Sequence, residues 1–435
     1  MTCSLTKTEV IRPRVRKVTA KGQARKLRLL VYGMNYSPEI AGVGKYTGEI
    51  AEYLSSSGLE VTVITTPPHY PGWKTLPGYK NWYSNSLDGG VRVSRSPLLL
   101  RKKMGGLWRL IAPLSFAVSS SPVLVWRMLR DRYDVVLCVE PTLLSAPLAH
   151  LLAKLTNAAT VLHVQDLEVD AAFAVGHLNS LSWLRSLGGL FERATLSKFN
   201  WVITISSKMA SKLLEKGVQN SKLSVVRNWV DTDHIYPLET PNSYRRDLGF
   251  SDEDFIVLYS GNIGAKQGLK VLLEAAVRLK NETNVHFVIA GEGPAKQGLE
   301  REYGDLASVR FLPFQPYERL NEFLNMADLH ALPQDKGAAD LVLPSKVGGM
   351  LASGKPIIFT AEEGTELADF LMGKATRVDP GCPESLAASI RHCKQWPSHF
   401  PPADQTSLSL LSKETGLQSI LSIVAQAANA AIEVS

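Results

Sequence analysis

Residues 26–46, KLRLLVYGMNYSPEIAGVGKY, decide the fold class. The apolar run at 26–36 has the length of a buried strand, and the glycine-containing loop after it leads into a predicted helix at 45–57. The next apolar run, at 59–66, predicts a second strand. A strand, a helix and a strand in this order indicate a parallel sheet with helices on both faces.

This alternation continues along the chain and then starts again. Further strands are predicted at 134–139, 159–164 and 201–206, and a second series at 255–260, 285–290, 309–312, 328–332 and 356–360. Between the two series, LSVVRNWVDTDHIYP at 223–237 has the polar and proline content of a crossing between domains. The predicted fold is therefore α/β, with doubly wound parallel-sheet domains at 26–225 and 238–410. The apolar helix at 411–435 is expected to pack back on the first domain.

The chain of 435 residues carries a formal net charge of +7, and this charge is unevenly distributed. Residues 1–30 hold nine basic side chains and one acidic side chain, so the rest of the chain is close to neutral. Since this body has no basic excess, nucleic acid is excluded as the main partner. Residues 1–25 lack the apolar core of a secretory signal and contain too little serine for a typical transit peptide, so they are predicted to be a disordered basic leader.

The four cysteines share no CxxC spacing. They predict neither a disulfide framework nor a cysteine metal site, and they indicate a reducing, cytoplasmic compartment.

Residues 107–130 have membrane-binding character. Their uncharged run LIAPLSFAVSSSPVLVW, at 110–126, contains two prolines and is marginally short for a membrane span. Four basic residues precede this run and two tryptophans lie near its ends: Arg101, Lys102, Lys103, Arg109, Trp108 and Trp126. The composition fits a helix lying on an anionic membrane surface, with a buried helix and a true span as alternatives.

Two glycine loops follow predicted strands and precede predicted helices. Gly42 and Gly44 lie in the first, and Gly261, Asn262 and Lys266 lie in the second. Backbone amides at such loops approach anions closely, and a lysine at the start of a helix neutralises phosphate. The first loop is not GxGxxG and no acid follows the second strand, which argues against a dinucleotide cofactor; a plain tight turn is its alternative.

Two further loops complete a ligand site that we expect between the domains. Glu292 lies in Gly-Glu-Gly-Pro after a strand, where a turn that starts a helix is the alternative to a ligand contact. Ser345 and Lys346 precede a helix, where they either meet a phosphate or cap the helix.

Six motifs, in this order, resemble those of the family 4 (group 1) glycosyltransferases, which have the two-domain GT-B fold: PEIAGVGKYT, RNWVDTDHIYP, SGNIGAKQGL, VIAGEGP, VRFLPFQP and PSKVGGMLASGKPII. Within this family, LHVQDLEVDAAFAVG at 162–176 and TTPPHYPGWK at 65–74 are most similar to the colanic-acid-type exopolysaccharide glycosyltransferases. The resemblance covers residues 26–430.

The resemblance implies transfer of a sugar from a nucleotide-diphosphate donor, with retention at the anomeric carbon and without a metal or other cofactor. By position, Lys266 matches the lysine that binds the diphosphate, while its usual partner arginine is replaced by Asn262. The two glutamates of the family pattern fall on Leu341 and Gly349, so both are absent. Asp340 and Lys346 are the candidates to replace them.

The predicted strand at 159–164 ends in His163-Val-Gln-Asp166. Alternation places His163 on one face of the strand and Asp166 at its carboxyl end, where a base or a charge-stabilising group is needed for transfer. The alternative is a core histidine and an aspartate that caps a turn. His69 and Tyr70, in PPHYPGW, are predicted to face the acceptor, with a rigid turn as the alternative.

Asp231-Thr-Asp233 resembles the paired carboxylates of metal-dependent transferases, but it falls in the predicted crossing, so no metal site is expected. We therefore expect a glycosyltransferase that moves a hexose from a UDP- or GDP-sugar to a lipid-linked or saccharide acceptor, in the cytoplasm at the inner face of the membrane. A sugar-nucleotide epimerase or phosphorylase of the same fold, or a non-catalytic module that binds nucleotide sugars, is the alternative.

Overall fold

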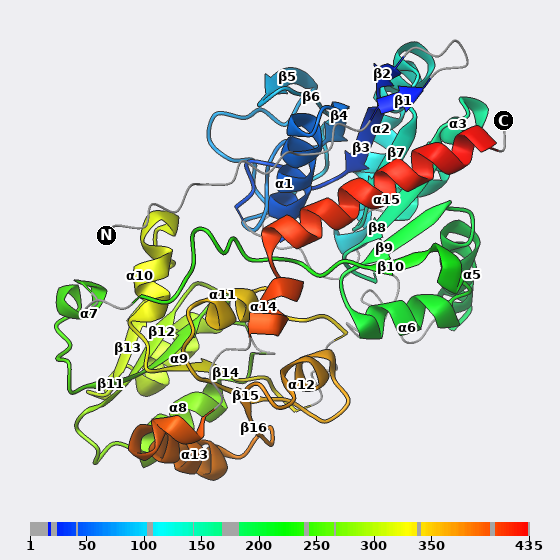
Figure 1. The fold of residues 1–435 in the computed structure, drawn as a ribbon. Helices are drawn as coiled ribbons and strands as arrows, with labels where there is room; N and C mark the ends of the chain where they lie inside the picture. Colours follow the sequence, from blue (N-terminus) through cyan, green and yellow to red (C-terminus); the bar gives the residue numbers. More distant parts are fainter. Residues whose placement is uncertain are drawn as a thin grey trace, which may run out of the picture. The chain divides into compact units, whose positions relative to one another are not determined.

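The computed structural model describes residues 16–18, 24–40, 42–101, 108–141, 143–167, 182–238, 243–264, 267–336, 341–400 and 405–433 (Figure 1). The chain forms two compact units. The first comprises 1–205, 209–226 and 417–435, and the second comprises 206–208 and 227–416. Each unit is built on a largely parallel sheet between helices, which confirms the predicted fold class.

The sheet of the first unit has the strand order β10-β9-β8-β7-β3-β4-β6-β5, and all neighbours are parallel except β5 and β6. Its strands are β3 (Arg28–Gly33), β4 (Glu60–Thr65), β5 (Ser84–Asp88), β6 (Val91–Arg95), β7 (Val135–Val139), β8 (Ala159–Val164), β9 (Trp201–Thr204) and β10 (Leu223–Val225). The helices of this part are α1 (Val43–Ser56), α2 (Trp108–Asp131), α3 (Ala146–Leu155), α5 (Ser182–Leu196), α6 (Ser207–Glu215) and α15 (Lys413–Glu433), with short 3₁₀ turns η1 (Leu143–Ser145) and η2 (Asn220–Lys222).

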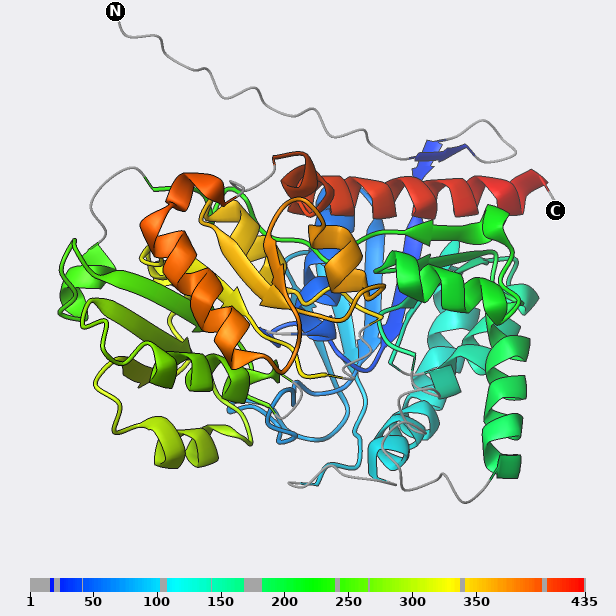
Figure 2. The same ribbon diagram turned by 90° about the horizontal axis from the view of Figure 1, so that it is seen from below.

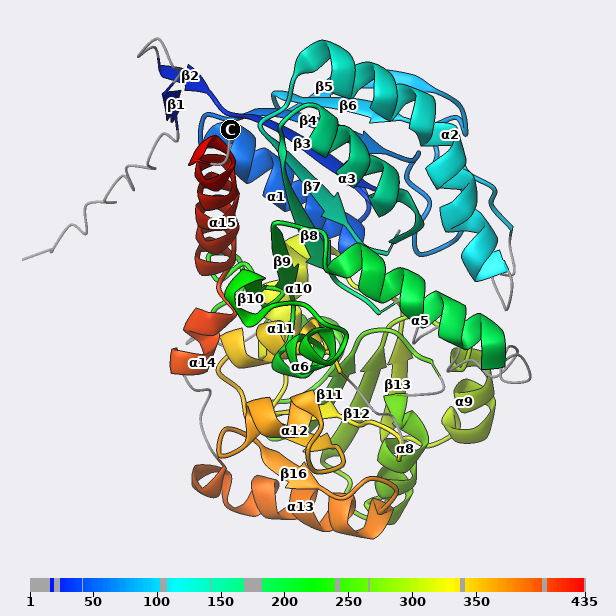
Figure 3. The same ribbon diagram turned by 90° about the vertical axis from the view of Figure 1, so that its right-hand side faces the viewer.

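Helices cover both faces of this sheet. Figure 3 shows α1 and α15 on one side and α2 and α3 on the other, and Figure 2 shows α15 (red) running along the α1 side. Strands covered in this way have no solvent-facing side, so their sequences are continuously apolar rather than alternating. β7 and β8 are buried at every residue.

The sheet of the second unit is parallel throughout, with the order β13-β12-β11-β14-β15-β16. Its strands are β11 (Phe255–Ser260), β12 (Val285–Ala290), β13 (Val309–Leu312), β14 (Leu329–Leu332), β15 (Ile357–Thr360) and β16 (Thr376–Val378). Its helices are α7 (Ser243–Asp247), α8 (Leu269–Arg278), α9 (Lys296–Tyr303), α10 (Leu320–Asn325), α11 (Lys346–Ala352), α12 (Glu366–Leu371), α13 (Pro383–Gln395) and α14 (Gln405–Leu410), with the 3₁₀ turns η4 (Tyr317–Arg319) and η5 (Pro397–His399).

Strand β11 divides the core of this unit between two faces. Val257 and Tyr259 belong to a cluster with side chains of α8 and α13, whereas Ile256 and Leu258 belong to a cluster with side chains of α10. Successive side chains of a strand point to opposite faces, so the run FIVLYS supplies both cores at once.

The structure describes two short strands at the predicted leader. β1 (Arg16–Val18) pairs antiparallel with β2 (Ala24–Lys26). Arg25 donates to both carboxylate oxygens of Asp134, at 2.7 and 2.5 Å, and the same carboxylate accepts from the backbone N–H of Arg28 at 2.9 Å. An ion pair with the body of the first unit therefore fixes the end of the leader, a contact that composition alone does not reveal.

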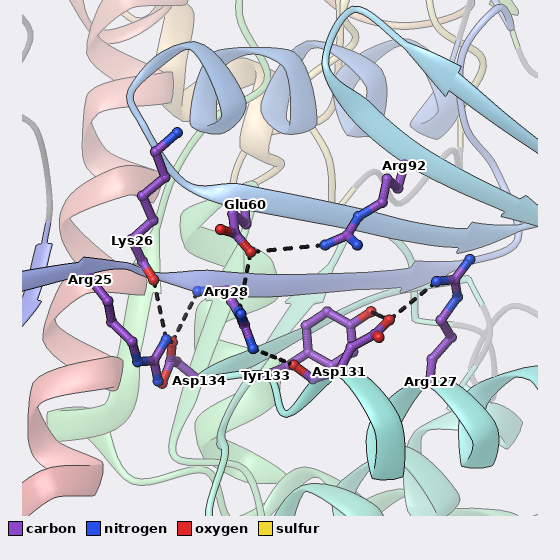
Figure 4. Close-up of polar contacts among 9 residues, drawn as sticks. All are labelled: Arg25, Lys26, Arg28, Glu60, Arg92, Arg127, Asp131, Tyr133 and Asp134. Atoms are coloured by element: carbon purple, nitrogen blue, oxygen red, sulfur yellow. Dashed lines mark hydrogen bonds and ion pairs between the residues drawn. The ribbon is translucent and has the colours of Figure 1, made fainter. Parts of the chain in front are cut away.

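Figure 4 shows that this ion pair belongs to a polar network at the amino ends of β3, β4 and β7. Arg28 donates to Glu60 at 3.1 Å and to the backbone oxygen of Asp131 at 3.0 Å, and Arg127 donates to the Asp131 carboxylate at 3.2 Å. Arg28 and Glu60 are the first residues of β3 and β4, while Arg127 and Asp131 belong to the carboxyl-terminal end of α2, so the network joins this helix to the strand ends.

No helix among the described residues is both long and apolar enough to cross a membrane. The apolar run at 110–126 forms most of α2, with Pro113 and Pro122 inside the helix.

We expect Asp134→Ala to lower the free energy of unfolding by roughly 1–3 kcal/mol, because a nearly buried carboxylate and its three hydrogen bonds are lost. Urea denaturation measures this change. Asp305→Ala, at an exposed position of the second unit, is the matched control and should leave the denaturation midpoint unchanged. Equal midpoints for the two variants would contradict the structural role of Asp134.

Candidate functional site

The predicted site residues of the first unit lie at the carboxyl ends of its parallel strands. The glycine loop follows β3, the segment of His69 and Tyr70 follows β4, and His163 and Asp166 lie at the end of β8. Ligands of open α/β sheets bind at this edge.

The glycines at the start of α1 are required by neighbouring side chains. Gly42 has a φ of 64° and directly precedes the helix, and a Cβ on it would lie 3.1 Å from the Tyr70 ring. A Cβ on Gly44 would lie 2.3 Å from a carboxylate oxygen of Glu39. The sequence analysis explained these glycines by the close approach of a phosphate. In the structure, the missing Cβ atoms leave room for the Tyr70 ring and the Glu39 carboxylate, so the two loops can pack together.

Glu39 is the residue that joins these loops, and sequence reasoning missed it. Its side chain is buried and accepts hydrogen bonds from Asn35 Nδ2 at 2.9 Å, from the His69 N–H at 2.9 Å and from the Tyr70 N–H at 3.0 Å. The available signal was an acidic residue inside a glycine loop that follows an apolar strand. The predicted acceptor-side residues are thus held by a carboxylate from the predicted donor loop.

His69 is fully buried and Tyr70 is 36% exposed. Burial lowers the pKa of His69, and the nearby Glu39 carboxylate opposes that shift only in part. Arg95, also buried, donates to the backbone oxygens of Thr66 and Ser37, each at 2.8 Å, and so ties the same two loops together.

His163 and Asp166 lie in contrasting surroundings. His163 is buried in β8, and neither of its ring nitrogens has a hydrogen-bond partner among the described residues. Burial lowers the pKa of His163 to about 4, so the imidazole is neutral at pH 7. Asp166 is exposed just beyond the strand. Both residues therefore lie at the carboxyl-terminal edge of the sheet. His163 is buried and neutral, and the Asp166 side chain is exposed.

In the second unit, two glycine loops lie in direct backbone contact. A Cβ on Gly291 would lie 1.8 Å from the backbone oxygen of Gly261, and one on Gly293 would lie 2.2 Å from that of Ile263. The N–H of Ile263 donates to the backbone oxygen of Glu292 at 2.9 Å. No other residue type fits at 291 and 293, so the loops of Gly261 and Glu292 form one ledge at the ends of β11 and β12.

Lys346 extends over this ledge. Its Nζ lies 4.0 Å from the centre of the Tyr259 ring and 3.4 Å from where a Cβ of residue 261 would stand. Ser345 is exposed and precedes α11 without capping it through its side chain. A cation and a backbone that only glycine permits therefore meet at one point, as a phosphate site requires.

The remaining predicted donor residues are placed as follows. Asn262 is exposed, and its backbone oxygen accepts from the Tyr259 hydroxyl at 2.5 Å. Glu292 is exposed, and its carboxylate pairs at 2.8 Å with Lys296, four residues further along the chain. Lys266 and Asp340 lie outside the described residues.

The positions of the absent family glutamates offer no acid. At Gly349 in α11, a Cβ would lie 3.2 Å from the Leu324 side chain, so this position faces the core. Glu366 is a buried carboxylate of the same unit, but it pairs with Arg227 and accepts from the Lys208 N–H at 3.0 Å. That carboxylate is committed to holding its own unit together.

Asp231 of the crossing also has a structural partner. Although burial raises its pKa, the hydrogen bond and charge of Lys413, at 3.1 Å, lower it overall. Its carboxylate also accepts from the Asp233 N–H at 3.2 Å, as in a turn. Within the described part of the chain, no three metal-ligating side chains lie together.

Comparisons with known proteins agree with this arrangement of loops. The model of the glycosyl transferase 4-like domain matches residues 41–229, and that of the glycosyl transferases group 1 matches residues 242–395. Together these matches cover most of the chain. The chain belongs to the family 4 (group 1) glycosyltransferases.

Individual relatives of this glycosyltransferase cover nearly its whole length. The Escherichia coli (strain K12) glycosyl transferase WcaI, named for colanic acid biosynthesis, is 40% identical over 406 residues, which are 91% of this chain and 99% of WcaI. Sucrose-phosphate synthase from Thermosynechococcus elongatus has a TM-score of 0.72 at 16% identity, over 93% of this chain and all of that one. Anabaena HepE in complex with UDP-glucose has a TM-score of 0.58 at 15% identity, over 94% and 99% of the two chains.

These structural neighbours share the fold with this glycosyltransferase, which confirms the predicted GT-B class. The expected resemblance to colanic-acid-type enzymes is likewise confirmed by the relative from Escherichia coli.

The depressed pKa of His163 predicts a loss of stability in acid. Below the pKa of about 6.5 of an exposed histidine, the unfolded chain binds a proton that the folded chain refuses down to about pH 4. Between pH 7 and pH 4 we expect the wild-type protein to lose roughly 3 kcal/mol more stability than His163→Leu.

Chemical denaturation over this pH range measures the difference. Leu162→Ala is the control: it removes core volume without removing a titrating group, so its stability curve should run parallel to that of the wild type. A His163→Leu curve with the wild-type slope would show that His163 is protonated in the folded state.

Proposed function

We propose that this protein transfers a hexose from a UDP- or GDP-linked sugar to a lipid-linked or oligosaccharide acceptor during the assembly of a cell-surface polysaccharide. The observation that carries the proposal is the position of Lys346 over Gly261 on the glycine ledge of the second unit. WcaI, named for colanic acid biosynthesis, supports the pathway, and HepE, solved with UDP-glucose, supports a UDP-sugar donor.

The chemistry at the donor follows from charge. The leaving diphosphate carries negative charge that amides and cations must stabilise as the bond to the sugar breaks. The ledge places Lys346 over Gly261, where the missing Cβ allows an anion to approach the backbone closely, and Lys266 belongs to the same loop sequence. We propose that these groups act in place of a metal ion, and that transfer proceeds with retention, as the family pattern implies.

The chemistry at the acceptor falls to the first unit. A hydroxyl that attacks the anomeric carbon must give up its proton, and a positioned base typically contributes ~10²–10⁴-fold. Asp166 is exposed just beyond β8, and neutral His163 lies three residues earlier, inside the strand. We propose Asp166 as the group that meets the acceptor or the developing positive charge, with His163 beneath it.

Labelled UDP- and GDP-sugars incubated with the protein and a bacterial lipid extract test this proposal. We expect labelled lipid from one donor, and Lys346→Ala should weaken binding of the matching nucleoside diphosphate about 10- to 100-fold, because a charge-assisted contact is lost. Isothermal titration calorimetry measures that affinity.

Lys280→Ala, at an exposed position after α8, is the control and should bind as the wild type does. Unchanged affinity in Lys346→Ala would rule out the ledge as the phosphate site. Epimerised free nucleotide sugar without labelled lipid would identify the alternative activity, and loss of transfer that only Mn²⁺ restores after EDTA would show metal dependence.

We further propose that the first unit contacts an anionic membrane in the cytoplasm, through the outer face of α2. Leu114, Val118, Trp126 and Leu129 are each about half or more exposed, and their separations of three, four and eight residues place them along one helical face. The guanidinium groups of Arg127 and Arg130 lie 4.9 and 5.0 Å from the centre of the Trp126 ring. Apolar side chains flanked by arginines favour an anionic lipid surface.

Sedimentation with phosphatidylglycerol-containing vesicles tests this contact. We expect the wild-type protein to pellet with them at low salt, and the Leu129→Glu variant to lose roughly tenfold in partitioning, since a charge replaces buried apolar area. Met372→Glu, at an exposed position of the second unit, should bind like the wild type. Equal partitioning of both variants would exclude α2 as the membrane face.

A further inference from the structure

The buried cluster around Glu39 and His69 contains a polar atom that the fold leaves unsatisfied. His69 is fully buried, yet its Nε2 has no hydrogen-bond partner among the described residues. Buried polar atoms are nearly always paired, and an unpaired one costs free energy. Such an atom at the ligand-binding edge of a parallel sheet is a candidate contact for a ligand.

The surroundings of the other ring nitrogen fix the tautomer of this histidine. Nδ1 lies 3.1 Å from the backbone oxygen of Pro67, 3.2 Å from the Thr66 hydroxyl and 3.4 Å from a carboxylate oxygen of Glu39. A carbonyl and a carboxylate only accept hydrogen bonds, so Nδ1 carries the hydrogen. The neutral ring then has its lone pair on Nε2, which is an acceptor in search of a donor.

Glu39 contacts both the backbone and the ring of His69. Its carboxylate accepts from the N–H groups of His69 and Tyr70 and also faces Nδ1. Gly44 leaves the space that the carboxylate occupies. Removal of Glu39 would therefore free both the loop and the tautomer of His69.

The neighbouring side chains indicate the kind of ligand. Trp73 packs against His69 with ring centres 5.5 Å apart, and Tyr70 meets Trp73 edge-on at 6.3 Å. Tyr70 and Trp73 reach solvent, so flat apolar surfaces lie beside a hydrogen-bond acceptor. Sugar rings present the matching chemistry, with C–H faces and donating hydroxyls.

Trp73, beside His69, has an unusual backbone conformation. Its φ of 49° lies in the left-handed region, which costs energy for a residue with a bulky side chain. Its ring packs on that of His69. Because Nε2 of His69 is buried, contact with a ligand requires that a neighbouring side chain moves.

We propose that a hydroxyl of the saccharide acceptor donates a hydrogen bond to His69 Nε2, and that Glu39 is the positioning residue that holds His69 for this contact. The inference rests on the proposed function, since it assigns the acceptor side of the same reaction. In this proposal, His69 accepts a hydrogen bond from the acceptor and is not protonated by it. Glu39 acts only by holding His69.

Nitrogen NMR of the full-length protein, labelled with ¹⁵N-histidine, tests the tautomer without any assay of activity. The His69 signals are assigned by their loss in His69→Asn. We expect a neutral ring with hydrogen on Nδ1 at pH 7, and Glu39→Gln should move the protonation midpoint of His69 to lower pH, because the carboxylate that raises its pKa is gone. A hydrogen on Nε2, or an unmoved midpoint, would overturn the role of Glu39.

The same signals report on the ligand. With UDP present, we add octyl glycosides of glucose, galactose and mannose in turn as probes. We expect the free Nε2 signal to move toward that of a hydrogen-bonded nitrogen with at least one of them. If none moves it, or if Nε2 is already hydrogen-bonded to water in their absence, the assignment to a saccharide hydroxyl is wrong.

Two substitutions at His69 distinguish a hydrogen bond accepted by Nε2 from a purely structural role of His69 in its loop. His69→Gln can place an amide oxygen near the position of Nε2, whereas His69→Asn keeps a donor near Nδ1 and has no acceptor at Nε2. In transfer to the lipid extract, we expect kcat/KM for the acceptor to fall about 3- to 10-fold in His69→Asn and to recover largely in His69→Gln, with the nucleotide affinity of both unchanged.

An equal fall in kcat/KM for the acceptor in the two His69 variants would show that His69 has only a structural role. Glu52→Gln, at an exposed position of α1, is the carboxylate control for Glu39→Gln and should act as the wild type does. If no nucleotide sugar supports transfer, the proposed function fails, while the NMR measurements still decide this inference.

Discussion

Helices on both faces of each sheet confine polar chemistry to the ends of the strands. A strand covered on both sides has no face on which a charged group can meet water, so such groups collect where the cover stops. In the first unit this separates two sets. Arg28, Glu60 and Asp134 link the amino ends of β3, β4 and β7, while Glu39 and His69 link the loops at the carboxyl ends of β3 and β4. The first set holds the starts of the strands together, and the second surrounds His69, whose Nε2 has no partner among the described residues.

The two units stabilise their ligand-side loops by different means. In the first unit, a buried carboxylate and a buried guanidinium cross-link two loops through side chains. In the second unit, Gly261 and Gly291 bring backbone against backbone, and side chains have no part in the contact. The second arrangement leaves a backbone surface without Cβ atoms beneath the Lys346 ammonium, which suits a charged phosphate. The first builds a shaped surface of side chains, which suits discrimination among neutral hydroxyls.

The sequence was sufficient for the fold because burial on both faces produces uninterrupted apolar runs, such as FIVLYS at 255–260, that are easy to recognise. It also placed Gly42, Gly261 and His163 correctly at strand ends, since parallel strands bring their carboxyl ends to one edge. It did not reveal Glu39, because the loop that this carboxylate holds, through the N–H groups of His69 and Tyr70, is 30 and 31 residues away in the chain. Nor did it reveal that Lys346 reaches Gly261, or that Arg25 is paired with Asp134, for the same reason: each is a contact between distant segments, and local patterns carry no information about it.

Two neutral histidines at one sheet edge need not share a role. Burial lowers the pKa of both, so neither is a cation at pH 7. His163 has no partner for either nitrogen among the described residues, so nothing in its surroundings selects one tautomer. His69 has three oxygens around Nδ1, and its acceptor is thereby fixed on Nε2. A fixed tautomer presents one defined acceptor, whereas a histidine without a fixed tautomer can donate or accept at either nitrogen. The fixed tautomer of His69 is therefore what the proposed hydrogen bond from a saccharide hydroxyl requires, and no partner among the described residues fixes the tautomer of His163.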